Sequence, residues 1–168
     1  YPEAHFDFFP FCGIQRPVLL YAVPREASTD LTVTTDIEET DGSTGHVRVR
    51  LDRDGGAPGT AYLTLRGHGT KITTQVPLDA EGAEATLTVL DAALWAPGSP
   101  HLYDLTVELA RDGALIDRYT LPVGIRTVAV EGDRLLLNGQ PVKLKGFGRH
   151  EDFFITGRGL LPAVIVKD

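Results

Sequence analysis

The chain has 168 residues, 42% of them hydrophobic and 23% charged, which is the composition of a globular protein with a buried core. Its 16 basic and 23 acidic residues give a net charge of −7, which argues against nucleic acid and anionic membranes as partners because both attract basic surfaces. The single cysteine, Cys12, excludes an internal disulfide, and no apolar run approaches the roughly 18 residues of a membrane-spanning helix.

Alternating apolar and polar residues, punctuated by Gly, Pro and Asp, predict β-structure along most of the chain. An apolar stretch at residues 18–23 is typical of a short strand, and residues 24–30 of a linker. Asp112-Gly113 predicts a two-residue hairpin turn. Further strands are predicted at residues 31–37, 46–52, 61–66, 71–76, 85–90, 102–109 and 114–119. About seven strands in one such run predict an all-β fold, an immunoglobulin-like antiparallel β-sandwich that lacks the antibody disulfide.

Two flanking segments do not fit this sandwich. Residues 1–15 are aromatic and irregular, and residues 135–168 follow its natural end. In the second flank, a hairpin at Asn138-Gly139 leads into a strand that ends in Arg, His, Glu and Asp at residues 149–152. Such a cluster at a strand end is typical of one wall of an active site. Because the chain also has no methionine, we expect it to be part of a longer protein with neighbouring domains on both sides.

Three stretches resemble motifs of the family 2 glycoside hydrolases, and within that family of the β-glucuronidases. They are DFFPFCGIQR at residues 7–16, LWAPGSPHLYDL at residues 94–105, and VGIRTV through NG to GFGRHED at residues 123–152. The first and last favour a β-glucuronidase over a β-galactosidase. Pro10 and Gln15 depart from the pattern, which usually has Asn and His there. The order and spacing of the three stretches carry the resemblance.

The resemblance implies a layout of three domains. Residues 1–24 are then the end of a jelly-roll sugar-binding domain, residues 25–126 the immunoglobulin-like sandwich, and residues 127–168 a linker and the start of a (β/α)₈ barrel, with its first strand at residues 141–146. In the family both catalytic glutamates come from later barrel strands, so this chain contains neither. We therefore expect it to be inactive alone, and we expect no cofactor or metal.

Four residues are candidates for the site of the intact enzyme. By resemblance, Asp7 reaches hydroxyls of the glucuronide ring, and His150 contacts a sugar hydroxyl or supports a catalytic group at the barrel mouth. Arg149 and Glu151 are expected to pair and brace the loop. Glu151 and Asp152 are not the catalytic pair, because strand neighbours point to opposite faces whereas the two carboxyls must sit roughly 5–5.5 Å apart.

Other conspicuous residues are assigned structural roles. Trp95 and Tyr103 are expected to pack in the sandwich, because sandwiches bury their large aromatic side chains, rather than to stack on a sugar. His46, His68 and His101 show no metal-ligand spacing and are expected to be solvated.

The resemblance therefore predicts a non-catalytic section of a retaining β-glycosidase that hydrolyses β-glucuronides. The sandwich would be a scaffold that orients the first domain over the barrel mouth and contributes to contacts in a homo-oligomer. Two alternatives stay open. One is a stand-alone immunoglobulin-like module that binds carbohydrate or a protein, and the other is part of a β-galactosidase of the same family.

Overall fold

The computed structural model describes residues 13, 14, 17–148, 157, 159, 163 and 166. Among them, residues Val23–Lys143 form one compact unit, and the remaining residues belong to a second unit. All the strands described below lie in the first unit, and no helix of the described residues is long and apolar enough to cross a membrane.

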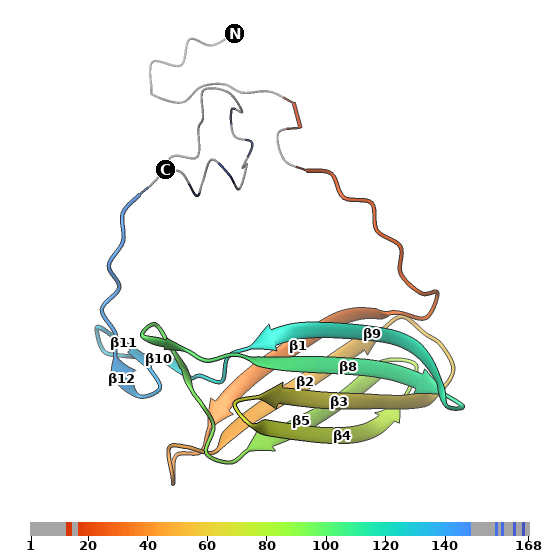
Figure 1. The fold of residues 1–168 in the computed structure, drawn as a ribbon, viewed down its shortest axis with the longest axis horizontal. Coiled ribbons are helices and arrows are strands. Elements are labelled where there is room, and N and C mark those ends of the chain that lie inside the picture. The colour runs from red at the N-terminus through yellow and green to blue at the C-terminus, as the bar shows by residue number, and fades with distance from the viewer. Residues whose placement is uncertain are drawn as a thin grey trace. The chain divides into compact units, whose positions relative to one another are not determined.

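Seven long antiparallel strands form two sheets, with β1, β2 and β5 in one and β4, β3, β8 and β9 in the other (Figure 1). The predicted sandwich of about seven strands is thus confirmed. The long strands are β1 (Ser28–Ile37), β2 (Gly45–Arg53), β3 (Gly59–Gly67), β4 (Thr70–Leu78), β5 (Gly82–Val89), β8 (Tyr103–Arg111) and β9 (Ala114–Val123). The shorter ones are β6 (Trp95–Ala96), β7 (Ser99–Pro100), β10 (Val128–Glu131), β11 (Arg134–Leu137) and β12 (Gln140–Pro141).

The core lies between the inward rows of the two sheets. Because alternate side chains of a strand point to one face, every second residue of β2 and β8 is buried. Tyr103 lies in this core, as expected, and its hydroxyl accepts a hydrogen bond from the backbone N of Ala93 at 2.8 Å. The largest fully buried side chains are Tyr103, Leu65, Leu78, Leu87, Leu105, Leu109, Ile125, Val47, Val49 and Val89.

The outer face of the larger sheet is polar. Hydroxyl groups pair across its strands, as between Thr106 and Thr120 at 3.0 Å, and Arg118 Nε donates to Glu108 Oε1 at 2.8 Å. Such side chains remain hydrated and paired among themselves. The outer surface of this sheet is therefore suited to solvent rather than to an apolar partner.

The two predicted hairpin turns are present. Asp112 and Gly113 have φ values of 50° and 78°, and Asn138 and Gly139 have 51° and 71°. Positive φ at both central residues is what a tight two-residue hairpin requires, and Asn, Asp and Gly tolerate it best. These turns join β8 to β9 and β11 to β12.

Two predicted strands are wrong. Residues 18–23 form no strand, and Leu19 and Leu20 are 81% and 102% exposed. The strand predicted at residues 141–146 is paired only at its start, since β12 ends at Pro141. In both segments the apolar pattern is present, but a strand also needs a hydrogen-bonding neighbour. The predicted linker is also shorter than expected, since β1 begins at Ser28.

Gly45 is the first residue of β2, and it packs against Ile125, which is fully buried. A Cβ there would lie 2.8 Å from Cγ2 of Ile125 and 3.1 Å from Cβ of Ala92. We expect Gly45→Ala to lower the free energy of unfolding by about 1–3 kcal/mol, because these neighbours are held by the core. Urea unfolding followed by the fluorescence of the single tryptophan measures this. Gly98→Ala is the control, because a Cβ there meets nothing within 4 Å. Equal losses in the two variants would contradict the prediction.

Candidate functional site

The predicted site residues Asp7, Arg149, His150 and Glu151 lie outside the described residues, as does Asp152. The structure therefore neither brings them together nor separates them. It does describe the two ends of the sandwich, where the chain enters after the segment that carries Asp7 and leaves before the segment that carries His150. Polar and charged side chains gather at those two ends and around the hollows in the surface of the sandwich.

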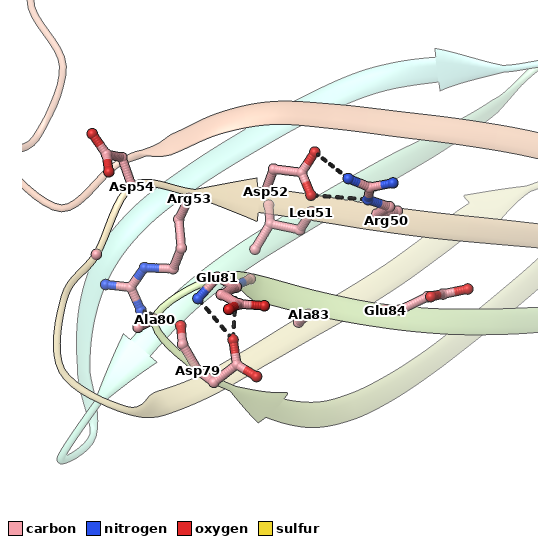
Figure 2. A pocket seen from close by; sticks show the side chains of 12 residues that line it. Arg50, Leu51, Asp52, Arg53, Asp54, Asp79, Ala80, Glu81, Ala83 and Glu84 are labelled. Carbon is pink, nitrogen blue, oxygen red and sulfur yellow. Dashed lines mark hydrogen bonds and ion pairs between the residues drawn. The ribbon is translucent and has the colours of Figure 1, made fainter.

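A hollow of about 670 Å³ lies where β2 ends and β5 begins and is lined by residues 50–55 and 79–84 (Figure 2). Two of its carboxylates accept local hydrogen bonds. Asp79 accepts hydrogen bonds from the backbone N of Glu81 and of Gly82, each at 2.9 Å, and Asp52 accepts from Arg50 Nε at 2.9 Å. These contacts shape the turn between β4 and β5 and the outer face of β2.

The shifted carboxyl groups do not fit acid catalysis. Backbone N–H groups of Gly82 and Glu81 hold the pKa of Asp79 below its usual value, and the Thr44 hydroxyl and neighbouring N–H groups lower the pKa of Asp41 to about 2. A glycosidase's general acid needs a raised pKa instead. The described residues also contain no cluster of three His, Cys, Asp or Glu side chains arranged to hold a metal.

Arg53 ends β2, and its side chain is fully buried. One Nη donates to the backbone O of Ala57 and of Asp79, each at 3.3 Å, and the other donates to Glu26 Oε2 at 3.2 Å. The backbone of Gly56, with φ of 107°, lies against the guanidinium, where a Cβ would come within 1.8 Å of an Nη. A buried cation of this kind is tolerated only when it is paired and hydrogen-bonded.

Glu26 lies just before β1 and joins Arg53 to Arg111, the last residue of β8, with which it forms a second ion pair. Hydrogen bonding to Arg111, and the charges of both arginines, hold the pKa of Glu26 below its ordinary value of 4.5. We call Glu26, Arg53 and Arg111 the entry clamp. It ties the segment that enters the sandwich to one strand of each sheet.

The exit node consists of Trp95, Arg126, Thr127 and Asn138. The side-chain O of Asn138 accepts from the backbone N of Thr127 at 3.0 Å, and its side-chain N donates to the backbone O of Trp95 at 3.1 Å. The Arg126 guanidinium lies 4.8 Å from the centre of the Trp95 ring, a cation–π contact. The Trp95 ring thus has protein neighbours in this junction, which supports its structural assignment.

The side of the sandwich between β1 and β9 is also hollowed. A hollow of about 570 Å³ there is lined by Leu31 and Val33 of β1 and by residues of β9. Polar links bridge this side near both of its ends. Ser28 N and Oγ each donate to Asp117 Oδ2 at 2.9 Å, and Thr35 Oγ1 donates to the backbone O of Arg126 at 2.7 Å. These bonds hold the edge strand β1 to the other sheet.

Entry clamp and exit node lie at opposite ends of the long strands. Arg53 and Arg111 end β2 and β8, whereas Trp95 precedes β8 and Arg126 follows β9. A nine-residue strand such as β8 is about 30 Å long at ~3.3 Å per residue. The sequence held one signal for the clamp: Arg53 continues the inward row of β2, where a charged residue needs a partner.

The comparisons with known proteins agree with this fold. A model described as "Glycosyl hydrolases family 2" matches residues 26–126, and one described as "Glycosyl hydrolases family 2, TIM barrel domain" matches residues 128–168. The chain is 41% identical to a β-glucuronidase of Paenibacillus borealis over 99% of the chain and 27% of that protein. It is 36% identical to the Homo sapiens β-glucuronidase over 99% of the chain and 26% of that protein.

The chain also resembles solved structures. The crystal structure of Ruminococcus gnavus β-glucuronidase matches with a TM-score of 0.80 and 34% identity, over 96% of this chain and 26% of that one. The same enzyme in complex with D-glucuronic acid matches with a TM-score of 0.80 as well. The chain thus spans about a quarter of the length of the curated relatives described above.

Removal of the buried guanidinium tests the entry clamp. We expect Arg53→Met to lower the free energy of unfolding by about 3 kcal/mol. The substitution removes one of the two cations that pair with Glu26, and it leaves the backbone O of Ala57 and of Asp79 without their hydrogen-bond donor. Arg50→Met on the same strand is the matched control. The Arg50 side chain is 66% exposed, and a loss of less than about 1 kcal/mol is expected for such a surface pair. Similar losses for the two variants in urea unfolding would refute a special role for Arg53.

The lowered pKa of Glu26 predicts a dependence on pH. Its ion pairs stabilise the fold fully above the unfolded-state value of 4.5, and this contribution is lost as the pH falls through the lower folded-state value. The difference in free energy of unfolding between the wild type and Glu26→Gln should therefore shrink as the pH is lowered from about 7 to about 3. Glu39→Gln, in the loop after β1, is the control. A difference that stays constant with pH would show that ionised Glu26 does not stabilise the fold.

Proposed function

Because the chain belongs to family 2 of the glycosyl hydrolases, we propose that it works as the middle section of a longer polypeptide that hydrolyses β-glucuronides. The observation that carries this proposal is the extent of the similarity: relatives named β-glucuronidase align over 99% of the chain, through the sandwich and both flanks. A likeness confined to the sandwich would support the architecture alone, because one fold serves many functions.

The proposed reaction needs parts that this chain does not supply. A retaining glycosidase uses one carboxylic acid to protonate the leaving oxygen and a second carboxylate to attack the anomeric carbon, roughly 5–5.5 Å away. We assign both to later strands of the barrel. The barrel model matches residues 128–168, whereas a whole barrel takes about 250 residues. In the chain as given, hydrolysis is therefore not expected.

Within that polypeptide, residues 1–24 would end a jelly-roll domain, residues 25–126 form the sandwich, and residues 127–168 begin the barrel. The sandwich serves as the scaffold between them. Asp7 precedes the entry clamp and His150 follows the exit node, and we assign both to contacts with the sugar, with Arg149 and Glu151 bracing the loop. The clamp and the node support this role because they fix the two points where the chain meets the sandwich. We also propose that the longer polypeptide forms a homo-oligomer.

The alternative of a stand-alone sugar-binding module finds little support on the sandwich. Binding of a sugar ring usually relies on an exposed aromatic side chain. The exposed aromatic residues of the unit Val23–Lys143 are Tyr62 and Tyr119. Tyr62 shares the outer row of its sheet with Glu108, whereas Tyr119 lies opposite the buried Val107, on the inner row. The two rings therefore do not form one platform.

Assay of the longer polypeptide tests the proposal. We expect it to hydrolyse an aryl β-glucuronide with initial release of the β-anomer, seen by NMR, and to prefer it over the matching β-galactoside by roughly a hundredfold or more, because a site that binds a carboxylate rejects a substrate without one. The 168-residue chain serves as the inactive control. A preference for the galactoside would support the β-galactosidase alternative. Saturable binding of a glucuronide to the 168-residue chain, with no hydrolysis by the longer one, would support the binding module.

A further inference from the structure

The chain has a single asparagine, Asn138, and a glycine follows it. An asparagine side chain loses its amide most readily before glycine, because glycine has no side chain to hinder a ring closure onto its backbone N. Gly139 is exposed and Asn138 is half-buried, so water reaches this turn. Spontaneous loss of an asparagine amide from this chain therefore takes place within the exit node.

The reaction is a ring closure followed by hydrolysis. The backbone N of Gly139 attacks Cγ of Asn138, so that a C–N bond forms and the Cγ–Nδ2 bond breaks. The side-chain NH₂ group leaves as ammonia with the proton that Gly139 N gives up. Water then opens the succinimide at either of its two carbonyl groups and yields aspartate or isoaspartate. Only water is consumed, and the attack requires the two reacting atoms to approach to roughly 3–3.5 Å.

Other segments hold both ends of the Asn138 amide. The side-chain O accepts from the backbone N of Thr127 at 3.0 Å, and the side-chain N donates to the backbone O of Trp95 at 3.1 Å. Trp95 is itself fixed, because its backbone N donates to the backbone O of the fully buried Ile125 at 2.9 Å. A rotation that turns Cγ toward Gly139 N must therefore break bonds to two separate parts of the sandwich.

The turn conformation opposes the reaction as well. The φ values of 51° and 71° at Asn138 and Gly139 are those of a type I′ turn, in which ψ of the first residue is about +30°. In the succinimide, the N of Gly139 must instead lie on the same side of the Cα–C bond as Cβ. Pairing of Leu137 with Gln140 holds the turn closed. Ring closure thus requires both the side chain and the turn to leave their places.

We propose that Asn138 is a deamidation site that the exit node keeps unreactive: the ring closes only when the hairpin of β11 and β12 opens locally, and the product cannot restore the node. Aspartate and isoaspartate have no side-chain donor for the Trp95 carbonyl and turn a carboxylate toward it. Isoaspartate also adds an atom to the backbone of the two-residue turn. Each event is therefore irreversible and removes the side-chain link between the hairpin and β6.

Mass spectrometry of the 168-residue chain at mildly alkaline pH tests this inference. The conversion of an amide to an acid raises the mass, and peptide mapping separates Asn138 from the three glutamines. We expect the folded chain to lose this amide at least about tenfold more slowly than the same chain unfolded in guanidinium chloride, because only the locally opened fraction reacts. Equal rates in the two states would overturn the inference.

Variants separate local opening from global unfolding. Thr127→Pro removes the N–H that bonds to the Asn138 side chain. Gly124→Ala, a milder change, would place a Cβ 2.9 Å from Cβ of Trp95. Each should speed the loss at least about threefold, because each weakens one of the two bonds. Arg53→Met is the control, since it destabilises the sandwich at the entry clamp and touches no residue of the exit node. Node variants that react at the wild-type rate, or no faster than Arg53→Met, would overturn the inference.

Discussion

Burial of the inward rows of β2, β3, β5 and β8 is the constraint on which the other features depend. These rows place apolar side chains from two sheets against one another, and packed interiors resist displacement. The entry clamp is built on the ends of β2 and β8, and the exit node on the segments that precede β8 and follow β9. Because the core holds the strands, it also holds the cations, carbonyl groups and amides at their ends in one arrangement, and this makes the sandwich suitable as a spacer.

The two junctions use different chemistry. At the entry, a carboxylate lies between two arginines, one of them fully buried, so the contact depends on charge and responds to acid. At the exit, neutral hydrogen bonds of Asn138 and the stacking of Arg126 on Trp95 predominate. Neither an amide nor an arginine side chain changes its charge over a wide pH range, so this junction keeps its strength. The structure therefore combines a pH-sensitive attachment on one side with a pH-insensitive one on the side that leads to the barrel segment.

The strands predicted wrongly show why pattern alone is insufficient. Residues 18–23 carry the apolar character of a strand, and residues 141–146 its alternation, but a strand forms only when a neighbour supplies hydrogen bonds. Within the sandwich such neighbours lie in the same chain, and the predictions there are confirmed. The candidate site residues Asp7, Arg149, His150 and Glu151 rest on resemblance in the sequence, and they stay predictions because the structure describes none of them.

The sequence by itself determined the sheet content, the seven long strands and the two hairpin turns, since alternation and positive φ are local properties that neighbouring residues specify. Its motifs also identified the family. Only the tertiary structure decided which residues join the ends of the sandwich. Arg53 meets Glu26 across 27 positions, Arg111 meets Glu26 across 85, and Asn138 meets Trp95 across 43. The order of strands in the two sheets determines which of these residues meet. No short stretch of sequence encodes that order.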